Sequence, residues 1–352
     1  MHKPQYYADY LALSQLLSLQ KPVSFEEGNQ PAHDEMLFVV IHQAYELWFK
    51  QILFEVDSII EILQQPAIND NSPQLQTVVH RLSRVNAIMR VLVHQMDVME
   101  TMTPMDFLDF RDLLRPASGF QSWQFKILEA RLGLRFEQRF GQHYYTSALR
   151  PEYTQLVKDA EQQPSLLQVM DAWLGRMPFF TNQELWKQFK PLTRDELAAP
   201  FGVFWEAYRQ ALKNSLSEHE QDNLPAFDAT MGFDGQQPAQ PLSAAASRAA
   251  LFIMLYRGYP LLQLPFQLIN GVLEIDEQLS TWRYRHMNMV HRTIGHRIGT
   301  GGSSGKNYLK GAADQHYIFK DFARLTSFLI ERRSLPALPA QVEALLGFAG
   351  AP

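Results

Sequence analysis

Apolar residues recur at helical spacing along almost the whole of this chain. A spacing of three and four residues places apolar side chains on one stripe of an α-helix, whereas a half-buried strand alternates apolar and polar residues. Convincing alternating runs are missing from the sequence. We therefore expect an all-α protein, in which any strand is minor.

Caps and breakers divide this helical pattern into segments. Thr103 and Pro104 begin a short helix, because Thr is a good N-cap and Pro is favoured at the first helical position. Pro116 ends that helix, Ser118 can cap the next one, and Gly133 fits its C-terminal stop. The other predicted helices cover residues 5–19, 34–64, 73–102, 119–132, 243–257, 265–297 and 317–332.

The chain is long enough to bury a large core, with 352 residues of which 46% are hydrophobic. We expect a single helical domain over residues 1–352, in which residues 136–241 form a more variable helical insertion and linker. Thr193 to Glu196 matches a capping box, which predicts a helix start. The stretch from Asp222 to Pro241 is rich in Pro, Gly and Gln and is the best candidate for a linker or mobile loop.

Charge and hydropathy exclude two classes of partner. The formal net charge of -5 gives no general attraction to phosphate backbones, and the basic cluster from Arg283 to Arg297 is interleaved with Met, Val and Ile. No apolar run is long enough to span a bilayer, and the first residues have no apolar signal-peptide core. We expect a cytoplasmic protein that binds neither nucleic acid nor membrane.

The sequence contains no cysteine. This excludes disulfides, zinc-thiolate sites, iron-sulfur clusters, a cysteine nucleophile and thiolate-ligated haem. Any metal must therefore be held by His, carboxylate, Tyr or Met side chains.

Three histidines, His286, His291 and His296, follow one another at intervals of five in the predicted helix 265–297. Each step turns the side chain by about 140°, at about 100° per residue, so the three cannot converge on one ion. One of them could serve alone as the proximal ligand of haem iron. By spacing alone, three ordinary surface or core histidines are the better interpretation.

The helical run ends in a loop from Gly299 to Gly305 that contains only Gly, Thr and Ser. Such a loop either covers a ligand or is a plain flexible connector. It departs from a phosphate-binding loop at Thr300 and Asn307, and Ser304 stands where a dinucleotide-binding fingerprint needs its third glycine.

One stripe of the predicted helix 34–64 carries Phe38, His42, Tyr45 and Phe49. A histidine on such a stripe is more often a hydrogen-bonded core residue than a catalytic one. Whether His42 is a core residue or a catalytic one therefore depends on the residues that surround it.

Arg111 lies one turn after Phe107 and close to small residues at 116–119. Together they could form a pocket with an aromatic wall and a guanidinium group for a carboxylate. The alternative is an ordinary surface arginine paired with Asp109 or Asp112.

Four segments in order resemble the tryptophan 2,3-dioxygenase family. They are HDEMLFVVIHQAYELWFKQILFE (33–55), ETMTPMDFLDFRDLLRPASGFQSWQF (100–125), WRYRHMNMVHR (282–292) and GTGGSSG (299–305). The resemblance covers roughly residues 7–132 and 243–329 and is weak between about 136 and 241.

The resemblance implies a mostly helical, homotetrameric enzyme that contains haem b with ferrous iron. It would insert O2 across the indole C2=C3 bond of L-tryptophan to give N-formylkynurenine, the first step of the kynurenine pathway. A modified indole amino acid is an alternative substrate. Alternatives of another class are a haem-based sensor that binds tryptophan or gas without turnover, and a metal-free helical scaffold.

The resemblance also implies roles for single residues. His286 would be the proximal iron ligand, whereas His291 and His296 would be structural. His42 would accept a hydrogen bond from the indole N–H, either as a base or as a positioning group. Phe38 and Phe107 would form the walls around the indole.

At the amino-acid end of the substrate, the resemblance implies that Arg111 binds the carboxylate. Thr300 would hold the ammonium and carboxylate end as the loop closes. Ser118 and Gly119 would line the oxygen side of the site. The N-terminal helix would reach the pocket of a neighbouring subunit through Tyr7, Tyr10 and Leu11.

Overall fold

The computed structural model describes residues 4–66, 72–180, 183–186, 189, 202–233, 241–295, 297, 299 and 306–347. Every regular element in these residues is helical, and none of them forms a strand. The predicted all-α class is therefore confirmed for the described part of the chain.

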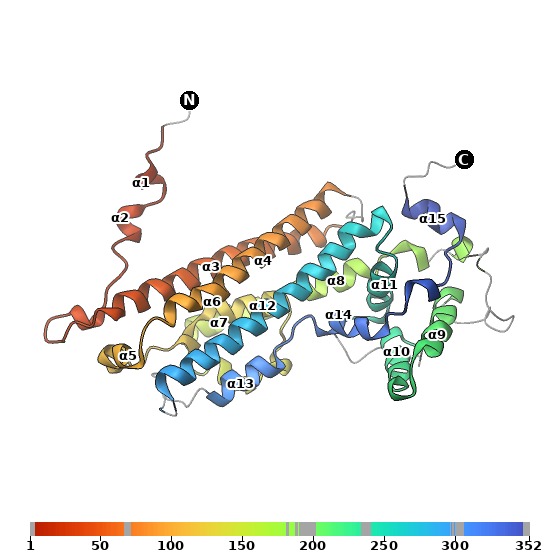
Figure 1. Ribbon diagram of the computed structural model, residues 1–352. Helices are drawn as coiled ribbons and strands as arrows, with labels where there is room; N and C mark the ends of the chain where they lie inside the picture. Colours follow the sequence, from red (N-terminus) through yellow and green to blue (C-terminus); the bar gives the residue numbers. More distant parts are fainter. Residues whose placement is uncertain are drawn as a thin grey trace.

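Three long helices lie side by side along the length of the molecule (Figure 1). They are α3 (Asp34–Leu63), α4 (Pro73–Met99) and α12 (Gln263–Ile294), and α4 packs against both of the others. Gly271 allows α12 to approach α4 closely, because a Cβ atom there would lie 2.5 Å from Leu82 Cδ2. Asn86 fixes the same contact by donating a hydrogen bond of 2.9 Å to the Gly271 carbonyl oxygen.

Shorter helices surround this three-helix body (Figure 1). Near one end lie α5 (Pro104–Arg111), α6 (Trp123–Leu132), α7 (Pro151–Gln162) and α13 (Lys306–Gln315). Toward the other end lie α8 (Leu166–Leu174), α9 (Val203–Ser215), α10 (Asn223–Met231), α11 (Ala244–Leu255), α14 (Lys320–Leu325) and α15 (Ala340–Leu346). Short 3-10 turns occur at Val23–Phe25, Asp112–Leu114, Gly119–Gln121, Phe136–Gln138, Gln142–Tyr145, Pro178–Phe180, Gln183–Trp186, Glu218–Glu220, Pro260–Leu262, Thr326–Phe328 and Arg332–Ser334.

The predicted capping residues are present at the start of α5 and at the end of α6. Thr103 and Asp106 form a reciprocal capping box at the start of α5, with Pro104 at the first helical position. Gly133 ends α6 with a φ of 136°, and a Cβ atom there would lie 2.7 Å from Leu167 Cβ. Only glycine therefore fits this turn without strain.

Three sequence-based predictions about helix extent are corrected. The predicted helix 5–19 is two short helices, α1 (Tyr7–Tyr10) and α2 (Leu13–Leu16), because Ala12 adopts a left-handed conformation between them. The predicted helix 119–132 begins as a 3-10 turn, and Ser122 rather than Ser118 caps α6. The helix predicted over 317–332 is mainly the short α14, and α13 before it was not predicted.

The prediction of a linker from Asp222 to Pro241 is wrong for its first half. Residues 223–231 form α10, whose Phe227 and Met231 are fully buried. Burial of these side chains in the core outweighs the Pro- and Gly-rich composition around them. Residues 234–240 and the capping box predicted at 193–196 lie outside the described residues.

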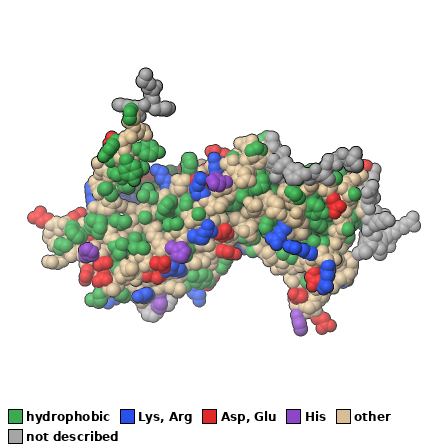
Figure 2. All heavy atoms as spheres, turned by 45° about the horizontal axis from the view of Figure 1, so that its top comes forward, with side chains coloured by type: hydrophobic (Ala, Val, Ile, Leu, Met, Phe, Trp, Pro, Cys, Tyr) green, Lys and Arg blue, Asp and Glu red, His purple; other side chains and the backbone are tan. Residues whose placement is uncertain are grey.

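The N-terminal helices α1 and α2 project away from the body, and Figure 2 shows apolar side chains exposed on this projection. Neither helix buries a residue within the chain, and the exposed fractions of Tyr7 and Tyr10 are 71% and 70%. Among the helices of the described residues, none is both long and apolar enough to cross a membrane.

Candidate functional site

A cavity of about 320 Å³ lies among α3, α4, α5, α6, α12 and α13. Phe38, His42, Tyr45 and Phe49 all line it from α3, which confirms that they share one stripe. Its walls are mostly apolar and aromatic, with a few polar groups that converge from different helices, as is usual for a small-molecule site.

One end of the cavity is aromatic. The rings of Phe38 and Phe107 lie 5.7 Å apart between centroids, and Phe110 packs edge-on against both at 5.5 and 5.4 Å. The imidazole of His42 lies 4.1 Å from the Phe38 ring. This arrangement suits a flat aromatic ligand that presents one polar atom to His42.

The hydrogen bond that His42 forms within the chain determines whether the polar atom of the ligand must be a donor or an acceptor. His42 Nδ1 lies 2.7 Å from the Phe38 carbonyl oxygen, which can only accept, so Nδ1 carries the hydrogen. Burial lowers the pKa of His42, which keeps the imidazole neutral and leaves Nε2 as an acceptor. His42 therefore offers an acceptor to a ligand N–H group.

Arg111 closes the same end from the last turn of α5. Its exposed fraction is 5%, and it lines the cavity together with Phe107, one turn earlier on α5. The alternative interpretation of Arg111 as an ordinary surface arginine is therefore wrong. Asp112, one of the two partners considered for it, forms an ion pair with Arg115. Ser118 and Gly119 also line the cavity, as predicted for site residues.

His286 lines the cavity from α12. Burial lowers its pKa to about 4, so the imidazole is neutral and its lone pair is available to a metal. No other described residue forms a hydrogen bond with this side chain, and its ring stacks on Trp282.

Some predicted residues fall elsewhere. Thr300 and His296 lie outside the described residues, and Gly299, just before Thr300, lines the cavity. Tyr7, Tyr10 and Leu11 do not line the cavity of their own chain. His291 also lines the cavity.

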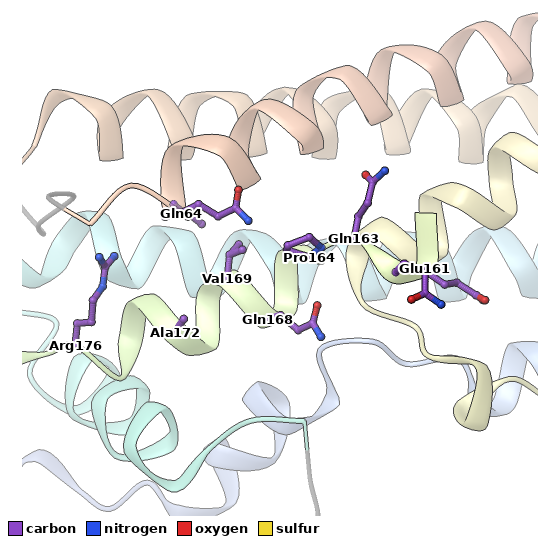
Figure 3. Close-up of a pocket in the computed structure, with 10 residues that line it drawn as sticks. Gln64, Glu161, Gln163, Pro164, Gln168, Val169, Ala172 and Arg176 are labelled. Carbon is purple, nitrogen blue, oxygen red and sulfur yellow. The ribbon is translucent and has the colours of Figure 1, made fainter. Parts of the chain in front are cut away.

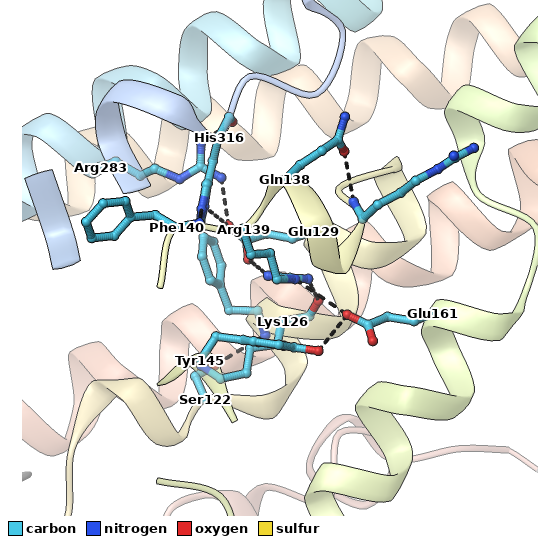
Figure 4. Close-up of polar contacts among 12 residues, drawn as sticks. Ser122, Lys126, Glu129, Gln138, Arg139, Phe140, Tyr145, Glu161, Arg283 and His316 are labelled. Atoms are coloured by element: carbon cyan, nitrogen blue, oxygen red, sulfur yellow. Dashed lines mark hydrogen bonds and ion pairs between the residues drawn. The ribbon is translucent and has the colours of Figure 1, made fainter. Parts of the chain in front are cut away.

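A buried polar network that no sequence pattern predicted forms another wall of the cavity (Figure 4). Glu129 accepts hydrogen bonds from Arg139 at 2.6 Å and from Arg283 at 2.8 Å. Burial alone would raise the pKa of Glu129, but the two guanidinium groups and His316 hold it well below its ordinary value. His316 Nε2 in turn accepts from the Phe140 backbone N–H at 2.8 Å.

The donor set limits what kind of metal centre the cavity could hold. Across the part of the chain that the structure describes, no three His or carboxylate side chains gather where they could bind an ion. A centre at His286 would therefore need most of its ligands from elsewhere. An iron porphyrin meets this condition, because it brings four nitrogens and needs one axial imidazole.

A second cavity, of about 520 Å³, lies where α3 ends against α7 and α8 (Figure 3). Glutamine side chains predominate in its lining, and Arg176 there donates to the carbonyl oxygens of Gln65 and Pro66. None of the predicted site residues lies in it. We therefore assign the chemistry to the aromatic cavity.

Comparison with known proteins gives one consistent family. The family model for tryptophan 2,3-dioxygenase matches residues 1–329. The chain is 39% identical over 376 residues to a tryptophan 2,3-dioxygenase of Bdellovibrio bacteriovorus, with 99% of each chain covered. It is 41% identical over 363 residues to that of Alteromonas mediterranea, with 98% of each covered. For the enzyme of Rattus norvegicus the identity is 39% over 347 residues, which cover 94% of this chain and 84% of the relative.

Proposed function

The chain belongs to the tryptophan 2,3-dioxygenase family, and from this membership we propose how its cavity carries out the reaction. The protein is an oxidoreductase, a dioxygenase that catalyses the first step of tryptophan catabolism. We propose L-tryptophan and O2 as substrates, N-formylkynurenine as product and haem b with ferrous iron as cofactor. The observation that carries this proposal is the placement of His42, Arg111 and His286 on one aromatic cavity.

His286 would hold the iron. Its imidazole is neutral and has no hydrogen bond with another described side chain or backbone group, so nothing in that part of the chain competes for its lone pair. Phe49, Phe125 and Trp282 line the same cavity with flat aromatic surface, which fits a porphyrin. Ferrous haem held by His286 would supply O2 binding without the electron donation of a thiolate that favours O–O cleavage.

The indole ring would lie against Phe38 and Phe107. In that position its N–H donates to His42 Nε2, the ring nitrogen that the bond from Nδ1 to Phe38 leaves as an acceptor. The hydrogen bond orients the C2=C3 edge of the indole, and the closely packed rings exclude water from it. Ser118 and Gly119 would line the oxygen side of the site.

Specificity for an amino acid would come from Arg111. A planar guanidinium can bind a carboxylate through two parallel hydrogen bonds. Ligands that lack the carboxylate would forgo an interaction of about 1.5–3 kcal/mol. We further propose that Thr300 binds the ammonium and carboxylate end of the substrate.

The N-terminal projection supports a shared active site in a homotetramer. Tyr7, Tyr10 and Leu11 are exposed in the single chain, and neighbouring exposed apolar side chains of this kind are typical of a surface that binds another protein. We propose that they cover the cavity of a neighbouring subunit. A protein that lacks residues 1–11 would then lose both its tetrameric state and its affinity for the substrate.

A product assay tests the proposed reaction. Protein loaded with haem, reduced and exposed to air is given L-tryptophan, D-tryptophan or indole, and N-formylkynurenine is measured by chromatography. We expect the product from L-tryptophan and far slower reaction of indole. No product from L-tryptophan would refute the proposal, and faster turnover of a ring- or β-substituted tryptophan would identify a modified indole amino acid as the substrate.

A further inference from the structure

We propose that Lys126 binds an anion in the cavity, and that this anion is a propionate carboxylate of the porphyrin. The inference rests on the proposed haem cofactor and adds a binding residue that the sequence resemblance does not assign. Lys126 is a buried cation on which Glu129 and Glu46 act only at longer range, because no ion pair joins either carboxylate to its ammonium group.

Lys126 lies on α6, one turn after Ser122, and its exposed fraction is only 6%. Its side chain lines the cavity. Among the described residues, none accepts a hydrogen bond from its ammonium group and no carboxylate lies within ion-pair distance of it. A buried ammonium without an anion costs several kcal/mol, so a partner is expected on the cavity side.

The two carboxylates that attract Lys126, Glu129 and Glu46, have closer partners of their own. Glu129, one turn further along α6, binds Arg139 and Arg283. Glu46 accepts from the Gln124 amide at 2.9 Å. Burial lowers the pKa of Lys126 to about 8, so the group remains mostly protonated at neutral pH. A cation is therefore present at neutral pH, and the partner must be an anion.

The carboxylate of the amino-acid substrate already has a better partner in Arg111. Arg111 ends α5 and lines the cavity together with Phe107 and Phe38, against which the indole would bind. Lys126 instead lies beside the Glu129 network on α6. A haem b molecule carries two propionates on flexible chains, and a lysine ammonium suits such a group because it acts as a point charge on a flexible stem.

The test measures how fast the porphyrin leaves the protein. Wild type, Lys126→Met and Lys126→Arg are loaded with ferric haem or with its dimethyl ester, in which both propionates are neutral. Transfer to excess apomyoglobin gives the dissociation rate. We expect Lys126→Met to lose haem about tenfold faster than wild type, since one charge-assisted hydrogen bond is removed. Lys126→Arg should retain the wild-type rate, and the diester should leave all three proteins at similar rates.

Lys50→Met is the matched control, because Lys50 is exposed on α3 and does not line the cavity. It changes the net charge equally and should leave the rate unchanged. Equal rates for wild type and Lys126→Met with haem would overturn the inference. So would equal acceleration with haem and diester, which would indicate lost packing rather than lost charge.

A second arm distinguishes the two sources of carboxylate. The affinities of wild type and Lys126→Met for L-tryptophan and for tryptamine, which lacks the carboxylate, are measured by calorimetry. We expect the same affinities in both proteins. Selective weakening of L-tryptophan would assign the carboxylate to the substrate and overturn the propionate assignment. A wild type that takes up no haem would refute the proposed function itself, and the inference with it.

Discussion

The indole of Trp282 lies parallel to the imidazole of His286, with 5.3 Å between ring centroids and 3° between ring planes. The two residues are one turn apart on α12, and Trp282 is itself packed against Phe125 at 5.0 Å and Tyr45 at 6.0 Å. A metal-bound histidine is usually oriented by a hydrogen bond from its second ring nitrogen. In the described part of this chain, the stack on Trp282 would take that place for His286, the proposed iron ligand.

Replacing Trp282 should therefore disturb the iron–imidazole bond. Trp282→Leu removes a ring contact worth about 0.5–1.5 kcal/mol and lets the imidazole adopt several orientations. We predict a broadened or split iron–histidine stretching band in the resonance Raman spectrum of the ferrous haem protein. Trp282→Phe keeps a stacked ring and should keep the single band. A single wild-type band in Trp282→Leu would show that the helix alone orients His286.

Replacing Arg111 should act on the carboxylate of the substrate alone. We predict that Arg111→Met weakens binding of L-tryptophan by about 10- to 100-fold, as expected for a lost charge-assisted hydrogen bond. Tryptamine should bind both proteins equally. The measurement is calorimetric titration with both ligands, and an equal loss for both would mean that Arg111 supports the fold of the cavity instead of contacting the substrate.

Adding a single carbon atom at Gly311 should lower the stability of the fold. A Cβ atom at this position of α13 would lie 2.5 Å from the Phe140 ring, and α13 supplies Tyr308, Leu309 and Ala312 to the cavity wall. We predict that Gly311→Ala lowers the free energy of unfolding by about 1–3 kcal/mol through overpacking. Gly258→Ala is the control, because a Cβ atom there meets nothing within 4 Å. Urea unfolding measures both, and equal stabilities would contradict the close packing at Gly311.

Asp276 should make the free energy of unfolding depend on pH. Burial raises its pKa to about 6, although its carboxylate accepts from the backbone N–H groups of Ile318 and Phe319 at 3.0 and 2.6 Å. Between about pH 4 and 6 the folded protein then binds a proton that the unfolded chain does not. This group therefore adds stability as pH falls through that range, by at most about 3 kcal/mol, and adds none above it.

The variant Asp276→Asn isolates this contribution, because its amide does not titrate. We predict that the difference in unfolding free energy between wild type and Asp276→Asn grows in favour of the wild type as pH falls from 7 to 4. Urea unfolding at several pH values measures it. A difference that stays constant across the range would mean that Asp276 titrates normally in the folded protein.

The long helices and the stripe of residues that line the cavity were predicted well from the sequence, because both follow from local rules. The predicted helix 34–64 agrees with α3 within one residue, and the cap at Thr103 is present. Phe38, His42, Tyr45 and Phe49 share a face because the helical period fixes their directions. Where packing rather than composition decides, as in α10, the prediction failed.

The charged wall of the cavity could not be predicted in the same way. Glu129 meets Arg283 and His316 only because α6, α12 and the segment after α13 come together in three dimensions. No periodic pattern in any one of these segments indicates the other two. Lys126 was missed for the same reason, since its burial depends on residues far away in the sequence.

The ferrous haem spectrum of His286→Gly, recorded with and without free imidazole, tests the proposed iron ligand most directly. We predict that the wild type shows an imidazole-ligated ferrous spectrum, that the variant loses it, and that added imidazole restores it by entering the space left by the side chain. A variant that keeps the wild-type spectrum without imidazole would contradict the assignment of His286.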